Sequence, residues 1–450
     1  MGSSGGDPQS SARVHESRVM KSKQKKVLIL AYYFPPLGMG GVQRVTKFVK
    51  YLPRFGWKPY VLTVKETDYW AKDYSLLKEL PSEAEVIRTG SFDPLRISRV
   101  LKRLFGRGER KEVSAKASSR RGSKLSSWLF LPDTKIGWLP FALMKGLFLC
   151  RKEKFDLIFS SSPPPSLHLT AYLLKLVFGL PWIADFRDPW TGYKLENLPT
   201  PLHVLMRRVV QRLILSKADR VIAANPAIKG VLESRHPDRS KVCLVEQGYD
   251  EEDFHAIPST SPDIFVIGYL GTLSPDCDPE PFFAALGDLI GAGVIPKDKI
   301  RFVHVGVCVG IDFDGLVRRY GLEDVAQQKG YLPHKEALKE MSGASLLLLA
   351  ASGHPLVFPA KVFECLRLGK PILGAADPET QIAALLIRAK AGRMASPEDK
   401  EGLKQALTSY FLEFKNGELT SGTDKDLVQE FERKFLTSKL ASLFDQIAGQ

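Results

Sequence analysis

Three charged side chains stand in the run DFRDPW, residues 185–190, directly after a short apolar segment that predicts a buried strand. In α/β proteins, ligands bind at the carboxyl ends of parallel strands. Arg187 and Asp188 are therefore candidate ligand-binding or catalytic residues. The alternative is a local ion pair that caps the following helix.

A second group of polar residues lies between His354 and Glu364. If Lys361 and Glu364 lie on the first turns of one helix, the spacing of three residues places both on the same face. A lysine there could meet a phosphate, and a carboxylate could bind a ribose diol. The alternative is an exposed salt bridge, which stabilises a helix by only a few tenths of a kcal/mol.

A glycine-rich loop, with Gly38, Gly40 and Gly41, separates an apolar run from a segment of helical spacing at 42–55. Glycines at such a turn let a ligand approach the backbone, and the helix N-terminus favours an anion. The strict dinucleotide fingerprint G-x-G-x-x-G is not present. A tight turn that needs positive φ explains the glycines equally well.

Alternating strand and helix patterns position these residues. Strand, glycine loop, helix and strand follow one another between residues 25 and 64, which is a βαβ unit. The alternation returns from 156 to 245 and restarts at 265, after a polar stretch at 257–262. A chain of 450 residues is long for one domain, so we expect two successive Rossmann-like α/β domains.

The run FPAKVFECLRLGKPIL, residues 358–373, resembles the signature P-x-K-x-x-E-x-x-x-x-G-x-P-I/V of GT-B glycosyltransferases of the family 4-like group, also called group 1. GYLGTL at 268–273, the glycine loop and DFRDPW also look like that group. The resemblance implies two Rossmann-like domains that face a cleft, with the acceptor mainly on the first and the nucleotide-sugar on the second. It also implies a C-terminal helix that crosses back to the first domain.

The resemblance assigns roles to individual residues. Glu364 matches the glutamate that binds the donor ribose, and Lys361 and His354 lie in the same donor segment. The glycines that would contact the donor are Gly40 and Gly41 in the first loop and Gly271, followed by Thr272, in the second.

Four positions depart from the family pattern. Thr272 and Asp278 replace the usual arginine and lysine, Leu356 replaces an earlier glutamate, and Arg187 stands where many members have histidine. Two cations that normally balance the leaving diphosphate are thus absent from their usual places. Lys361, Arg187 or His354 could replace them. The catalytic candidates are Arg187, Asp188 and Lys361, with Asp188 as a polar partner for the acceptor.

We expect the following organisation: a disordered tail at 1–24, an N-terminal acceptor domain at 25–256 with a basic insertion at about 92–140, a nucleotide-sugar domain at 257–426, and C-terminal helices at 427–450.

The net charge of +14 is localised, since segments 1–26 and 96–125 carry +4 and +9. Residues 94–105 have the pattern of a basic amphipathic helix, and Trp128 follows. This suits an anionic membrane surface bound through residues 94–130. A helix packed on the first domain is the alternative. We expect no nucleic-acid partner, because interleaved aromatic residues and a recognised binding module are lacking.

The sequence thus predicts a nucleotide-sugar-dependent hexosyltransferase, with a glycan or lipid-linked acceptor, in cell-envelope or exopolysaccharide synthesis. The family implies retention of configuration. The UDP- or GDP-sugar is a substrate, and we expect neither a cofactor nor a metal because no D-x-D motif is evident. Five scattered cysteines favour a reducing compartment, so we expect a cytoplasmic protein, peripheral on the inner face of the membrane. A catalytically silent GT-B-like binding protein is the main alternative, and a basic nucleic-acid-binding protein the lesser one.

Overall fold

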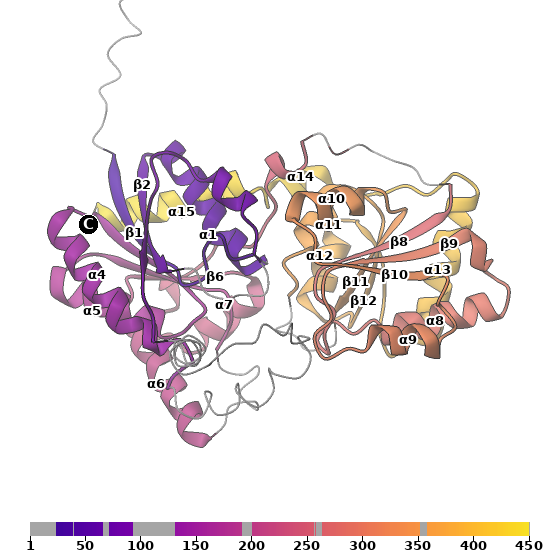
Figure 1. Ribbon diagram of the computed structural model, residues 1–450, viewed down its shortest axis with the longest axis horizontal. Helices are drawn as coiled ribbons and strands as arrows, with labels where there is room; N and C mark the ends of the chain where they lie inside the picture. Colours follow the sequence, from indigo (N-terminus) through magenta and orange to yellow (C-terminus); the bar gives the residue numbers. More distant parts are fainter. Residues whose placement is uncertain are drawn as a thin grey trace, which may run out of the picture.

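The computed structural model describes residues 24–38, 40–65, 72–92, 131–190, 200–255, 257, 263–351 and 358–449. These residues form two lobes, each built on a twisted parallel sheet with helices on both faces (Figure 1). The arrangement confirms the predicted α/β class with two Rossmann-like domains.

The first sheet has the order β3-β2-β1-β4-β5-β6-β7, and all neighbouring strands are parallel. Its strands are β1 (Lys25–Leu30), β2 (Trp57–Val64), β3 (Glu85–Thr89), β4 (Leu157–Ser162), β5 (Trp182–Phe186), β6 (Arg220–Ala223) and β7 (Val242–Leu244).

Alternating side chains of the first sheet meet two different helix layers. Leu28 and Leu30 of β1 pack towards α4, α5, α6 and α7, whereas Val27 and Ile29 pack towards α1 and α15. This is the period of two expected of a strand that is buried on both faces. The helices are α1 (Gly40–Tyr51), α4 (Leu139–Lys152), α5 (Leu167–Phe178), α6 (Pro201–Lys217), α7 (Pro226–Glu233) and α15 (Arg433–Ala448).

The second sheet has the order β10-β9-β8-β11-β12-β13 and is also parallel throughout. One face packs against α8, α9 and α13, and the other against α10, α11, α12 and α14. The strands are β8 (Phe265–Leu270), β9 (Ile300–Val305), β10 (Ala326–Gly330), β11 (Leu346–Ala351), β12 (Ile372–Ala376) and β13 (Gly392–Ala395). The helices are α8 (Glu280–Gly291), α9 (Phe313–Arg319), α10 (His334–Ser342), α11 (Val362–Leu368), α12 (Gln381–Arg388), α13 (Lys400–Lys415) and α14 (Lys425–Gln429).

The last helix, α15, lies on the first domain beside α1, as the resemblance implied (Figure 1). Leu436, Leu440 and Phe444 are fully buried there, and the Phe444 ring centroid lies 5.2 Å from that of Trp57. Each such side chain contributes about 1.5–3 kcal/mol when it is buried. The second domain is therefore joined to the first by the linker and by a helix packed in the first core.

Residues 131–140, which we expected inside the basic insertion, instead belong to the core of the first domain. The Trp138 side chain is buried, and its indole N–H donates to Thr89 Oγ1 over 2.8 Å. The Asp133 carboxylate accepts a hydrogen bond from Ser166 N at the start of α5. One tryptophan and one capping carboxylate produce no periodic pattern, so the sequence did not reveal them. Residues 94–130, the expected membrane segment, lie outside the described residues.

Among the described residues, no helix has both the length and the apolar character that crossing a bilayer requires.

Candidate active site between the two domains

A cleft of about 450 Å³ lies between the two domains, and residues of both domains line it. The first domain contributes Gln43, Asp73, Arg187, Asp188 and Asn225, and the second contributes Gly271, Thr272, His334, Lys361 and Glu364. Arg433, at the start of α15, also lines the cleft. A ligand in this space would contact both domains at once.

Lys361 and Glu364 lie together at the start of α11, as their spacing predicted. Lys361 is the residue before the first turn, and Glu364 lies in that turn. The Lys361 ammonium is 3.6 Å from the centroid of the Tyr269 ring. Burial lowers the pKa of Lys361 to about 8. The lysine therefore remains mostly charged at pH 7 and can attract an anion.

Gly271, directly after β8, and Gly306, directly after β9, both line the cleft. Gly271 has φ +104°, and a Cβ there would lie 3.4 Å from the Lys361 side chain. Gly306 has φ +151°, and a Cβ there would lie 2.0 Å from the Gly271 carbonyl oxygen. Only glycine fits such a conformation with so close an approach.

His304 forms a hydrogen bond with the Gly271 carbonyl oxygen. Burial lowers the pKa of His304 to about 4, so its imidazole is neutral. Its Nε2 lies 2.8 Å from the Gly271 carbonyl oxygen. Since a carbonyl oxygen only accepts, Nε2 carries the proton and donates it. This bond fixes the backbone that precedes Thr272.

Arg187 lies at the end of β5 and holds three backbone carbonyls. Its Nε donates to Ser162 over 2.6 Å, and its other nitrogens donate to the carbonyl oxygens of Pro163 and Gly41. Burial lowers the pKa of Arg187, but a guanidinium keeps its charge in proteins. Arg187 thus presents a positioned positive charge to the cleft, next to Asp188.

Asp185, the first acid of DFRDPW, is structural. Its carboxylate forms a fully buried ion pair with Arg44 of α1, with nitrogen–oxygen distances of 2.7 and 3.1 Å. Arg44 also donates to the carbonyl oxygens of Val245 and Glu246, each over 2.7 Å. The pair therefore joins α1, β5 and the segment after β7. Of the three charged residues of this motif, Asp185 lies in the core, whereas Arg187 and Asp188 line the cleft.

Residues 39–253 match the model of Glycosyltransferase Family 4 in sequence. No curated protein matches the chain.

Solved structures similar to this chain span both domains. Sucrose-phosphate synthase from Thermosynechococcus elongatus shares 16% identity, with 94% of this chain and 99% of that chain covered and a TM-score of 0.65. HepE from Anabaena, in complex with UDP and glucose, shares 14%, with 94% and 100% covered and a TM-score of 0.63. The lipopolysaccharide outer core galactosyltransferase WaaB shares 13%, with 93% and 99% covered and a TM-score of 0.56. Such likeness shows that the chain has the GT-B fold.

Three positions named from the sequence are not among the described residues that line the cleft. Gly41 lies in the first turn of α1, which begins at Gly40, and its carbonyl oxygen accepts a hydrogen bond from Arg187, a residue that does line the cleft. Asp278 accepts a hydrogen bond from Glu280 N at the start of α8. His354 lies outside the described residues.

His334 is a residue of the cleft that the sequence analysis missed. Its Nε2 lies 3.4 Å from Glu364 Oε1 and 3.5 Å from Asp253 Oδ2. Burial lowers the pKa of His334, but the two carboxylates outweigh burial and raise it overall. Burial raises the pKa of Glu364, and His334 opposes this shift. The histidine follows Pro333 at the start of α10 in no recognisable motif, so nothing in the sequence linked it to Glu364.

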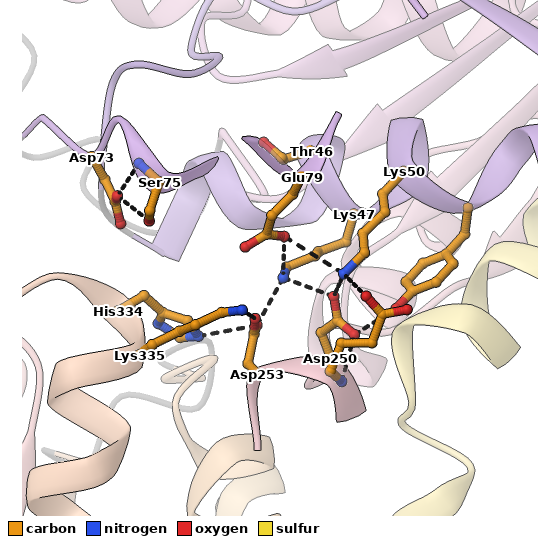
Figure 2. A network of polar contacts seen from close by, with 12 residues as sticks. Thr46, Lys47, Lys50, Asp73, Ser75, Glu79, Asp250, Asp253, His334 and Lys335 are labelled. Atoms are coloured by element: carbon orange, nitrogen blue, oxygen red, sulfur yellow. Dashed lines mark hydrogen bonds and ion pairs between the residues drawn. The ribbon is translucent and has the colours of Figure 1, made fainter. Parts of the chain in front are cut away.

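From Asp253, the polar contacts continue into the first domain (Figure 2). The Lys47 ammonium of α1 lies 2.6 Å from Glu79 and 2.7 Å from both Asp250 and Asp253. These three carboxylates are close enough together to hold a metal ion, but the Lys47 ammonium already lies among them. Burial lowers the pKa of Lys47, but the three carboxylates outweigh burial and raise it overall. The network thus joins α1 through Asp253 to His334 and Glu364.

Arg433 was also missed, because it lies on the C-terminal helix far from any motif. The side chain is buried, and one guanidinium nitrogen donates to Gln247 Oε1 over 3.2 Å. Its Nη1 has no hydrogen-bond partner among the described residues. Burial and the nearby Arg44 lower its pKa. A buried donor beside the cleft with no acceptor is where an anionic ligand is expected.

Proposed function

We propose that the chain transfers a sugar from a nucleotide-sugar to a glycan or lipid-linked acceptor, with retention of configuration. The observation that carries this proposal is that Lys361 and Glu364, at the start of one helix, both line the cleft, with Lys361 against Gly271. A cation suits the diphosphate, a carboxylate suits the ribose diol, and a glycine lets the phosphate approach the backbone.

In this transfer, the acceptor oxygen bonds to the anomeric carbon as the bond from that carbon to the diphosphate breaks. Negative charge grows on the diphosphate, and positioned cations stabilise it. Lys361 and Arg187 supply these cations in place of the residues replaced by Thr272 and Asp278. Asp188 accepts a hydrogen bond from the acceptor hydroxyl. The acceptor proton passes to the departing diphosphate, so that charge and atoms balance.

The donor proposed is a UDP-hexose, with a GDP-sugar as the other possibility. Support comes from HepE, whose structures hold UDP, UDP with glucose, and UDP-glucose. WaaB, a galactosyltransferase of the lipopolysaccharide outer core, supports a role in envelope or exopolysaccharide synthesis. We place that reaction at the inner face of the membrane, in the cytoplasm.

Calorimetric titration with UDP, GDP, their common sugar conjugates and NAD tests the proposal. We expect saturable binding of one nucleoside diphosphate, weakened about tenfold or more by Glu364→Ala, because a charged hydrogen bond contributes about 1.5–3 kcal/mol. Glu364→Gln keeps the size of the side chain but removes its charge, so it tests whether nucleotide binding requires the carboxylate. Glu336→Ala, an exposed glutamate of α10, is the matched control. A folded protein that binds none of these nucleotides would contradict the proposal.

A catalytically silent GT-B-like binding protein is the second candidate. The observation in its favour is that Thr272 and Asp278 offer no cation to the diphosphate, and Asp278 is engaged at the start of α8. Release of UDP from a UDP-sugar distinguishes the two. Nucleotide binding without any turnover, with a range of acceptors, would favour the silent protein.

A further inference from the structure

Three neighbouring helices of the first domain expose large apolar side chains. Nearly half of the exposed large apolar side chains among the described residues lie on α4, α5 and α6. They are Met144, Phe148, Leu176, Val177, Leu202, Leu205 and Val209, each more than half exposed. On α6, Leu202, Leu205 and Val209 recur at helical spacing and so form one stripe. Several large apolar side chains exposed on neighbouring helices indicate an interaction site.

Helices α4, α5 and α6 form one packed layer. They cover the same face of the first sheet, opposite α1 and α15. Helix α4 packs against α5, and α5 packs against α6 (Figure 1). Gly146 of α4 allows the close approach, since a Cβ there would lie 2.7 Å from Leu174 of α5. The exposed side chains therefore belong to a single surface, which we call the α4–α6 face.

The charged residues within these three helices have one sign, although Lys175 of α5 pairs with Asp219, which follows α6. Helices α4, α5 and α6 contain no aspartate or glutamate. They contain eight basic residues: Lys145, Arg151, Lys152, Lys175, Arg207, Arg208, Arg212 and Lys217. Arg208 and Arg212 are exposed beside the α6 stripe, and neither forms an ion pair with another described residue. By contrast, α8, α10 and α13 of the second domain carry acidic residues among their basic or apolar ones.

We propose that the α4–α6 face binds an anionic lipid bilayer. Apolar side chains that enter the acyl boundary, together with lysines and arginines that meet anionic headgroups, are the features of an interfacial surface. A protein partner of ordinary composition would not require three consecutive helices without a single acid. The partner is therefore the membrane, which meets the described residues of α4, α5 and α6.

The position of α6 relates this face to the cleft. Arg187 and Asp188 follow β5 and line the cleft, and α6 is the next helix of the chain. Leu202 and Leu205 thus lie at the end of α6 nearer the carboxyl edge of the sheet. Docking by this end would place a lipid-linked acceptor beside the cleft. This placement of the acceptor rests on the proposed transfer, whereas the binding of the face to a bilayer does not.

Vesicle co-sedimentation of the full chain tests the proposal. The vesicles are phosphatidylcholine alone, or equal parts of phosphatidylcholine and phosphatidylglycerol. One variant combines Leu202→Ser, Leu205→Ser and Val209→Ser, and another combines Arg208→Glu and Arg212→Glu. Their controls lie on the second domain: Ile387→Ser with Leu412→Ser, and Arg318→Glu with Lys339→Glu, all exposed positions.

We expect the wild type to bind the anionic vesicles far more tightly than the neutral ones, and less tightly as salt increases. Each face variant should lose about tenfold or more in affinity, because every basic residue near an anionic surface contributes on the order of 1 kcal/mol. The control variants should bind as the wild type does. Thermal unfolding and UDP titration of every variant show whether the fold and the cleft are intact.

Wild-type affinity for anionic vesicles in both face variants would overturn the proposal, as would a wild type that binds neither vesicle. If light scattering showed instead that the leucine variant separates a dimer, with no vesicle binding, the face would join two copies of the chain. Failure of UDP binding in all proteins would end the proposed transfer but leave the vesicle result unaffected.

Discussion

His334 Nε2 lies 3.4 Å from Glu364 Oε1 and 3.5 Å from Asp253 Oδ2. One imidazole thus stands between the carboxylate that we assign to the donor ribose and a carboxylate held by Lys47 of the first domain. A protonated His334 satisfies both. Charged contacts thus run from Glu364 through His334 to Asp253 and Lys47. The strength of these contacts depends on pH, because His334 pairs with the two carboxylates only when it is protonated.

The first prediction concerns this histidine. Because the folded pKa of His334 is raised, its protonation stabilises the fold fully below the unfolded pKa of about 6.5. The contribution is lost as pH rises through the folded pKa. His334→Gln should therefore lower the free energy of unfolding by about 1–3 kcal/mol at acidic pH and by less at alkaline pH. Denaturant unfolding of both proteins across this pH range measures the difference. A difference that does not change with pH would contradict the expectation.

The second prediction concerns Lys361, whose pKa is lowered to about 8 by burial. A diphosphate attracts only the protonated form, so affinity for UDP should fall as pH rises through about 8, by up to about tenfold per pH unit. Lys361→Met should bind UDP about tenfold or more weakly at pH 7 and show no such fall. Titration calorimetry above pH 7 measures both effects, with the exposed Lys339→Met as control. The same pH dependence in Lys361→Met and wild type would exclude this role.

Much of the fold was predictable because buried strands and amphipathic helices leave strong patterns. The predicted alternation of strands and helices between residues 25 and 64, from 156 to 245 and from 265 onward agrees with the structure. The strands β3 and β10 were missed, because each is the outer strand of its sheet, buries little surface and carries polar residues such as Gln327 and Gln328.

The site was predictable only where its residues share one element. Lys361 and Glu364 lie three residues apart at the start of one helix, so their spacing alone indicated a common face. His334, Asp253 and Arg433 come from three separate segments. Their meeting in the cleft depends on how the two domains pack, and no local pattern in the sequence records it.

The third prediction concerns the buried pair of Arg44 and Asp185, both fully inaccessible. Removing either partner leaves an uncompensated charge in the core, which costs about 3–5 kcal/mol. Arg44→Met and Asp185→Asn should each destabilise the first domain by about this amount in denaturant unfolding. The double variant should be less destabilised than the sum, because no unpaired charge remains. Strict additivity would show that the two side chains act independently.

The last prediction concerns Arg433, whose Nη1 is buried beside the cleft with no hydrogen-bond partner among the described residues. Replacing a buried, incompletely paired cation with an apolar side chain of similar length is often neutral or stabilising. Arg433→Met should therefore leave the melting temperature unchanged or higher. If an anionic ligand supplies the missing acceptor, the same variant should bind UDP about tenfold or more weakly. Lys439→Met, an exposed cation on the same helix, controls for the loss of one positive charge. Equal UDP affinity of Arg433→Met and wild type would show that Arg433 meets no ligand, and a lowered melting temperature would show that its present contacts already compensate its burial.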